Sequence, residues 1–223
     1  MRVILIAAAL LSFGALLGAC GDDDTVVTTT TVAPGDGGAN EDPPPVRTGV
    51  GELDTIIADA LAGEQDAYIE MAALTGYQRL NCVTGDSTEF LPQCRDTDAP
   101  GAEVEALPVV GCLPAWVRPE QVTDQYRQSL PAGETDLLAV YDPAPDTPVI
   151  NRGFGATSVL VFSTGTNADG NPRGTALHIL DGRIVLVEPS CDNVSELLAP
   201  ERVESYIIEP APVAGEDEGS PDQ

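Results

Sequence analysis

The segment Gly174–Glu188, GTALHILDGRIVLVE, decides the fold class because it has the pattern of a β-hairpin. Asp181-Gly182 is the dipeptide that a two-residue type I′ turn favours, and apolar runs flank it on both sides. The regular register of such a hairpin gives three central pairs: Ile179 with Ile184, Leu177 with Leu186, and His178 with Val185. Both faces of the hairpin are then largely apolar, so we expect other elements to cover each side.

Two further strands are expected before this hairpin. Leu137–Tyr141 is a short apolar run between turn-forming residues, and Thr157–Thr164, TSVLVFST, is rich in β-branched residues. The sequence therefore predicts a sheet of about four antiparallel strands. The segment Leu80–Val110 has little periodicity and is expected to be loop-like.

Helical spacing dominates the residues before the sheet. In the segment 52–76, ELDTIIADALAGEQDAYIEMAALTG, apolar residues recur every three or four positions, with a break at Gly63. Two helices are expected there, over residues 53–61 and 64–74. Another helix is expected to begin at Pro119 and to run to about Leu130. A short C-terminal helix is expected after Pro200, with Val203 and Ile207 facing inward.

This order of elements predicts an α+β domain in which N-terminal helices pack on a curved antiparallel sheet. The layout, carried by residues 52–76 and 174–188, resembles the ketosteroid-isomerase-like (SnoaL-like) cone. In that family a curved sheet wraps around N-terminal helices and encloses a pocket. The resemblance implies a site for a small apolar molecule, where enzymes of the family place Asp, His, Tyr or Arg.

The N-terminus has the features of an export signal. Met1-Arg2 is followed by an apolar run from Val3 to Leu17, which is too short for a typical membrane span of about 20 residues. The next residues, Leu17-Gly18-Ala19-Cys20, resemble the bacterial lipobox. The resemblance implies cleavage after Ala19 and acyl chains on Cys20, which would anchor the chain in the bacterial cell membrane. The alternative is an ordinary secretory signal with an incidental cysteine.

Composition divides the rest of the chain into three parts. After the signal peptide (residues 1–19), residues 20–48 are rich in Thr, Asp, Gly and Pro and are expected to form a lipidated, disordered tether. Residues 49–209 are expected to form a single domain, and residues 210–223 a disordered acidic tail. The chain has 36 acidic and ten basic residues, for a net charge of −26, which argues against nucleic acid as a partner.

Four cysteines remain besides Cys20, and an even number in an exported chain predicts two disulfides. Three pairings are conceivable. We expect Cys82–Cys94 and Cys112–Cys191, because the first pair brackets a short loop rich in turn-forming residues. No C-x-x-C pair is present and His178 is the only histidine, so neither a metal nor another cofactor is expected.

No catalytic motif was recognised, and His178 is interpreted as a structural residue because no acidic partner is evident at strand spacing. Trp116, the single tryptophan, is interpreted as a core anchor rather than a ligand platform. The sequence thus predicts a non-enzymatic, membrane-anchored module that binds a small apolar ligand or a protein of the cell envelope. The alternatives are a cone-type hydrolase or isomerase that uses His178, and a structural protein of envelope assembly.

Overall fold

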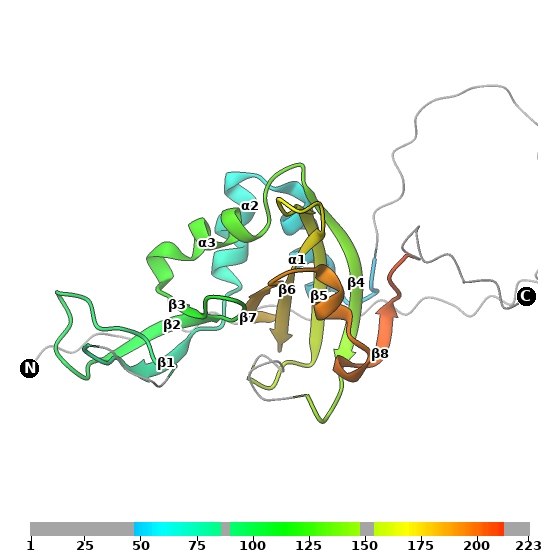
Figure 1. Ribbon diagram of the computed structural model, residues 1–223. Helices are drawn as coiled ribbons and strands as arrows, with labels where there is room; N and C mark the ends of the chain where they lie inside the picture. The colour runs from blue at the N-terminus through cyan, green and yellow to red at the C-terminus, as the bar shows by residue number, and fades with distance from the viewer. Residues whose placement is uncertain (1–46, 86–89, 148–153, 212–223) are drawn as a thin grey trace, which may run out of the picture. The chain divides into compact units, whose positions relative to one another are not determined.

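Three α-helices and an eight-stranded sheet make up the part of the chain described by the computed structural model, residues 47–85, 90–147 and 154–211 (Figure 1). The helices are α1 (Gly51–Ala62), α2 (Gln65–Ala73) and α3 (Val122–Ser129). The strands are β1 (Gln78–Asn81), β2 (Glu103–Val109), β3 (Ala115–Val117), β4 (Thr135–Pro143), β5 (Ser158–Thr166), β6 (Pro172–Leu180), β7 (Arg183–Pro189) and β8 (Val203–Ile208). Three short 3-10 helices complete the set: η1 (Pro119–Gln121), η2 (Val194–Leu198) and η3 (Pro200–Arg202).

Several sequence predictions concern residues outside this description. These are the signal peptide, the cleavage site at Ala19, the lipid on Cys20, nearly all of the tether, and the tail from residue 212. Among the described residues, no helix is both long enough and apolar enough to cross a membrane.

The predicted α+β class is confirmed, but the sheet is larger than expected and mixed. Its strand order is β1-β2-β7-β6-β5-β4-β8, with β3 paired to β2. Strands β2 and β7 are parallel where Val109 lies opposite Val187. In Figure 1, β1 and β8 lie at opposite ends of the sheet.

Two segments were predicted wrongly. The expected loop Leu80–Val110 contains β2 and the end of β1. In β2, Val104 and all residues from Ala106 to Val109 are buried. The expected C-terminal helix is a single 3-10 turn at Pro200–Arg202 followed by β8, which pairs with β4. The β-branched and aromatic residues of Val203–Ile208 favour this extended form over a helix.

The helices form where the apolar spacing predicts them. Helix α1 ends at Gly63, whose φ of 61° is left-handed and whose N–H donates to the Asp59 carbonyl. A Cβ at Gly63 would lie 2.8 Å from Cα of Ala132, so both the backbone angle and the close approach require glycine. The predicted break between two helices is therefore confirmed.

One face of the sheet packs against these helices in a continuous apolar core. Large buried side chains come from both layers and include Tyr68, Met71, Tyr126, Leu130, Leu160, Phe162, Leu177 and Ile179. The hydroxyl of Tyr68 donates to the Leu130 carbonyl, and those of Tyr126 and Thr75 lie 2.7 Å apart. Side chains thus occupy the region between helices and sheet where a cone would place its pocket.

The opposite face of the sheet is covered by η2. Val194 and Leu197 of η2 pack with residues of the three strands beneath them: Ala139, Tyr141, Val159, Val161 and Ala176. Gly174 of β6 permits this contact, because a Cβ there would collide with the Val194 side chain and the Phe162 carbonyl. The prediction that both faces of the hairpin are covered is confirmed.

The hairpin turn is confirmed, whereas its predicted register holds only beside the turn. Asp181 and Gly182 have φ of 49° and 70°, as a type I′ turn requires. Ile179 lies opposite Ile184, but the register then shifts by one residue. The observed partners beyond the shift are Leu186 for His178 and Val187 for Leu177. One extra residue in β7 makes this a β-bulge, which turns Leu186 and Glu188 to the His178 side.

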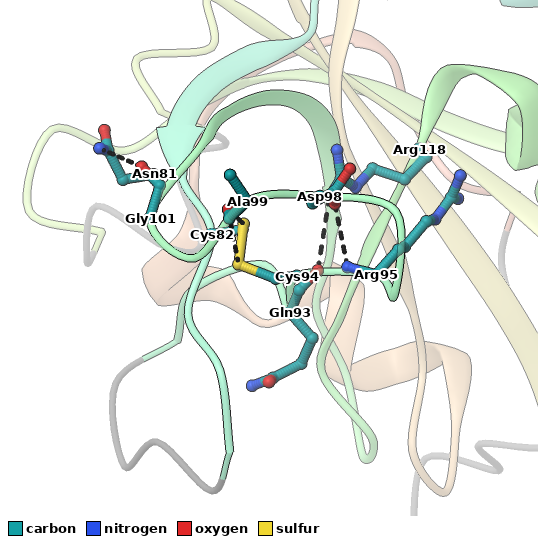
Figure 2. Close-up of a disulfide and its surroundings, with 9 residues drawn as sticks. All are labelled: Asn81, Cys82, Gln93, Cys94, Arg95, Asp98, Ala99, Gly101 and Arg118. Carbon is teal, nitrogen blue, oxygen red and sulfur yellow. Dashed lines mark hydrogen bonds and ion pairs between the residues drawn. A yellow bond between two sulfur atoms is a disulfide. The ribbon is translucent and has the colours of Figure 1, made fainter.

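Both predicted disulfides are confirmed. Cys82 pairs with Cys94 and Cys112 pairs with Cys191, with sequence separations of 12 and 79 residues. The first bridge closes the loop beside β1, as Figure 2 shows. The second joins the segment after β2 to the segment after β7.

Candidate functional site

The sequence singled out His178, and the structure buries it in a polar network on the η2 side of the sheet. His178 Nε2 lies 2.8 Å from Oε2 of Glu188, and Arg202 Nη2 lies 2.5 Å from the same oxygen. Arg202 Nη1 also donates to the Glu196 carbonyl at 3.1 Å. The network therefore joins β6, β7 and the two short 3-10 helices that cover them.

Burial and pairing fix the protonation states of this network. Burial lowers the pKa of His178, and this effect outweighs the opposite influence of Glu188. Burial alone raises the pKa of Glu188, but the hydrogen bonds from His178 and Arg202 outweigh it and lower the pKa. A neutral His178 thus donates from Nε2 to a charged Glu188, and Arg202 carries the compensating positive charge.

Glu188 is the acidic partner that the sequence did not reveal for His178. In a regular hairpin Glu188 lies on the opposite face from His178, and only the bulge brings the two side chains together. His178 is nevertheless 0 % exposed and Glu188 only 8 %. A substrate cannot reach this pair in the described structure, so its geometry fits a structural role.

A surface groove lies elsewhere, between the Cys82–Cys94 loop and β3. It has a volume of about 640 Å³ and is lined by Phe90, Leu91, Pro92, Gln93, Cys94, Arg95, Pro114, Ala115, Trp116, Arg118 and Gln121. This volume lies in the range of about 300–1,000 Å³ that is typical of ligand sites. We refer to it below as the Trp116 groove.

Aromatic side chains gather at this groove. The rings of Phe90 and Trp116 are stacked with their centroids 4.9 Å apart. The ring centroids of Trp116 and Phe154 are 6.2 Å apart. Phe154 has a φ of 59°, a left-handed conformation that is rare for a bulky residue. Trp116 is only partly buried and lines the groove, so its interpretation as a core anchor is corrected.

Two arginines line the groove, and each is paired with a carboxylate that is not among the lining residues. Arg118 Nη2 lies 2.7 Å from Oδ2 of Asp98, and the same oxygen accepts a 2.9 Å hydrogen bond from the Arg95 backbone N–H. Figure 2 shows Asp98 close to both arginines beside the disulfide. The Arg95 N–H and the Arg118 guanidinium hold the pKa of Asp98 below its usual value, although burial opposes this. Arg95 also pairs with Glu120.

Leu113 is an exposed apolar residue next in sequence to the groove lining. Leu113 directly precedes the lining residue Pro114 in the sequence. It is 88 % exposed, more than any other large apolar residue in the described part of the chain. The neighbouring Cys112–Cys191 bridge fixes one end of this segment to the sheet. Leu113 is therefore an exposed apolar side chain one residue away from the groove lining.

In the described ranges, no three His, Cys, Asp or Glu residues are grouped so as to hold a metal ion. Comparisons with protein-family models, with curated proteins and with solved structures return no match for the chain.

Sequence reasoning missed the Trp116 groove because its two walls lie on segments far apart in the chain. Residues 90–95 and 114–121 come together only through the pairing of β2 with β1 and β3. The one available signal was the presence of Phe90 and Trp116 in segments otherwise rich in turn-forming residues. Such aromatic residues outside regular apolar patterns are candidates for binding contacts.

Proposed function

We propose that this protein is an exported lipoprotein, anchored by acyl chains on Cys20, whose domain binds a segment of another envelope protein in the Trp116 groove. The composition of the groove is the observation that carries the binding proposal. Tryptophan and arginine are enriched among the residues that dominate binding energies, and here Trp116, Arg95 and Arg118 line one concave surface.

The form of the groove favours a protein segment over a small apolar molecule. Its walls combine aromatic rings with arginine and glutamine side chains, and Leu113 lies exposed beside it. A small apolar molecule in the manner of the cone family would need space between helices and sheet. Tyr68, Tyr126 and Phe162 are buried there.

The enzymatic alternative receives no support from His178. The residue is hydrogen-bonded to Glu188 as a general base would be, but it is 0 % exposed and faces η2 rather than the helices. A general base must come within hydrogen-bonding reach of its substrate, directly or through a water molecule. The role of His178 is therefore taken as structural in this proposal.

The anchor rests on the sequence Leu17-Gly18-Ala19-Cys20 after an apolar run. Replacing Cys20 by serine should abolish labelling with a radioactive fatty acid and release the protein from the membrane fraction. A matched Ser12→Cys, Cys20→Ser variant keeps the cysteine count but moves the thiol. If either variant stays in the membrane fraction after a carbonate wash, the anchor proposal is wrong.

Photo-crosslinking in intact cells tests the binding proposal. A benzophenone amino acid at Leu113 should give a discrete crosslinked product, and this product should be lost when Trp116 is replaced by alanine. The same amino acid at Ile69, which is 51 % exposed on α2, is the control and should not give that product. Equal products from both positions, or a product that survives Trp116→Ala, would contradict a specific groove.

A further inference from the structure

Among the described strands, β3 has one backbone edge that no other strand pairs with, beside the Trp116 groove. In the part of the chain that the structure describes, β3 pairs with β2 and with no other strand. Val109 of β2 lies opposite Ala115 of β3 and also opposite Val187 of β7, so β3 and β7 lie on opposite sides of β2. The second side of β3 is therefore an edge of the sheet.

The direction of the backbone groups follows from strand alternation. Val110 N–H donates to the Val187 carbonyl at 2.9 Å, so the backbone groups of Val110 point toward β7. Those of Val109 and Leu107 then point toward β3, where their partners are Ala115 and Val117. Trp116 lies between these partners, and its N–H and C=O point away from β2.

Neighbouring residues extend this edge. The Pro114 carbonyl points to the same side as the Trp116 groups by the same alternation. Arg118 keeps an extended backbone, with φ of −75° and ψ of 155°, so the chain continues in the direction of β3 to this residue. One wall of the groove thus presents donors and acceptors at the spacing of a strand, which is the arrangement that an added strand requires.

The side chains at this edge specify what an added strand would carry. Val117 faces the helices, so Trp116 and Arg118 project on the other side of the strand, and both line the groove. Two residues of an extended chain span about 6.6 Å. A chain lying beside β3 therefore meets an aromatic ring at one position and a guanidinium group two residues away.

We propose that the groove takes an extended segment of a partner protein, which adds to this edge of β3 with an apolar residue beside Trp116 and an acidic residue two positions away beside Arg118. This inference rests on the proposed function and names the chemistry of the partner. The described lining residues include two arginines and no acidic residue. Arg118 already pairs with Asp98 and Arg95 with Glu120, so a carboxylate of the segment would join these ion pairs beside the guanidinium groups. The net charge of −26 disfavours strongly acidic partners at long range, so the segment carries one acidic residue among neutral ones.

Peptide selection on the full chain carrying Cys20→Ser provides the test. A random library of short displayed peptides is selected on the immobilised protein, and the best binders are synthesised and titrated while the fluorescence of the single tryptophan, Trp116, is followed. We expect selected peptides to share an apolar and an acidic residue separated by one position. Their affinity should fall about fivefold when glutamine replaces the acidic residue. Arg118→Gln should remove this preference, whereas Arg127→Gln, in an exposed ion pair with Asp124, is the control and should not.

Peptide N-methylation tests the added strand without altering the protein. Methylation of the peptide N–H that faces β3 should weaken binding about fivefold, because it removes one backbone hydrogen bond. Methylation of the next residue, whose N–H points away from β3, should have little effect. Equal effects at both positions, or selected peptides without the acidic residue, would overturn this inference while leaving groove binding intact.

Other outcomes separate this inference from the function on which it rests. If Trp116→Ala leaves both peptide binding and the Leu113 crosslink unchanged, the proposed groove function itself is wrong. If sedimentation shows self-association that Trp116→Ala abolishes, the occupant is a second copy of this chain and the partner inference is overturned. If the groove binds anilinonaphthalene sulfonate in a Trp116-dependent manner while the selection yields no peptide, the partner inference is overturned in favour of a small apolar ligand.

Discussion

His178 and Glu188 are ten residues apart in the chain and are joined across the β6–β7 hairpin by a buried 2.8 Å hydrogen bond. The bond exists because a bulge shifts the register between His178 and Ile179. Arg202 completes the arrangement from the segment that enters β8. The network therefore couples the central hairpin to the edge strand at the far end of the sheet.

The state of His178 predicts that the protein loses stability in mild acid. Burial lowers the pKa of His178 below the ordinary value of 6.5. In mild acid His178 is therefore protonated in the unfolded chain but stays neutral in the folded chain. The free energy of unfolding should therefore fall as the pH decreases below about 6.5, with a slope of up to about 1.4 kcal/mol per pH unit. Urea unfolding between pH 7.5 and pH 5, values chosen to span about one unit or more on each side of this pKa, measures the slope.

His178→Gln is the matched variant for this measurement. Glutamine can donate a hydrogen bond to Glu188 but does not titrate, so the slope between pH 6.5 and 5 should shrink. In both proteins the free energy of unfolding should fall again below about pH 4.5, because the pKa of Glu188 is also lowered in the folded state. An unchanged slope in the variant would show that His178 is not the group responsible.

Removing Arg202 should be strongly destabilising because it leaves Glu188 buried without its cation. Arg202→Met is expected to lower the free energy of unfolding by about 3–5 kcal/mol. The double variant Arg202→Met, Glu188→Gln should recover much of this loss, since the buried charge is gone. The control Arg127→Met removes an exposed pair with Asp124 and should cost less than about 1 kcal/mol. If the double variant is no more stable than Arg202→Met, the ion pair is not what stabilises this face.

Replacing Gly174 is predicted to destabilise the fold because η2 packs closely on β6 at this position. A Cβ at this position would lie 2.8 Å from the Phe162 carbonyl oxygen and would collide with Val194. Gly174→Ala should therefore cost about 1–3 kcal/mol in thermal or urea unfolding. Gly51→Ala at the start of α1, where nothing lies within 4 Å, is the control and should be neutral or stabilising. A neutral Gly174→Ala would mean that η2 can move away without loss.

Local sequence patterns predicted the helices and the central strands well. The apolar spacing around Ile56 and Tyr68 and the dipeptide Asp181-Gly182 depend on interactions within a few residues, which the sequence displays directly. Strand β2 escaped prediction in part because it contains Pro108. This proline is tolerated because its nitrogen faces β7, and the two strands pair only at Val109.

The candidate site depended on information that local patterns do not contain. Trp116 and Phe90 come together only after β3 pairs with the end of β2, Leu107–Val109, and the Cys82–Cys94 loop folds back toward η1. The His178–Glu188 contact needed a single-residue bulge, and no residue in Arg183–Glu188 marks its position. The spacing of Val203 and Ile207 in edge strand β8 also fits a helix. This segment is a strand because it pairs with β4, and that pairing is not visible in the local sequence.

The two disulfides should differ in their contribution to stability. In the chain-entropy model, closing a loop of 79 residues stabilises the fold by about 4.5 kcal/mol and a loop of 12 residues by about 3 kcal/mol. Cys112–Cys191 also joins β2 to β7, where these strands share the single pair Val109–Val187. Backbone pairing between β2 and β7 is limited to this pair in the described chain, so the long bridge should matter for the attachment of the whole β1–β2–β3 region.

Paired alanine variants of each bridge test this difference. Removing Cys112 and Cys191 should lower the unfolding midpoint more than removing Cys82 and Cys94. Without the Cys112–Cys191 bridge, amide hydrogen exchange should become faster in β2 and β3. Without the Cys82–Cys94 bridge, faster exchange should be confined to the loop that lines the Trp116 groove. The loop variant should also weaken binding to the selected peptides, because Cys94 lies in the groove wall between Gln93 and Arg95. Equal midpoints, with peptide binding lost only in the Cys112–Cys191 variant, would mean that the groove is held by the sheet junction rather than by its own loop.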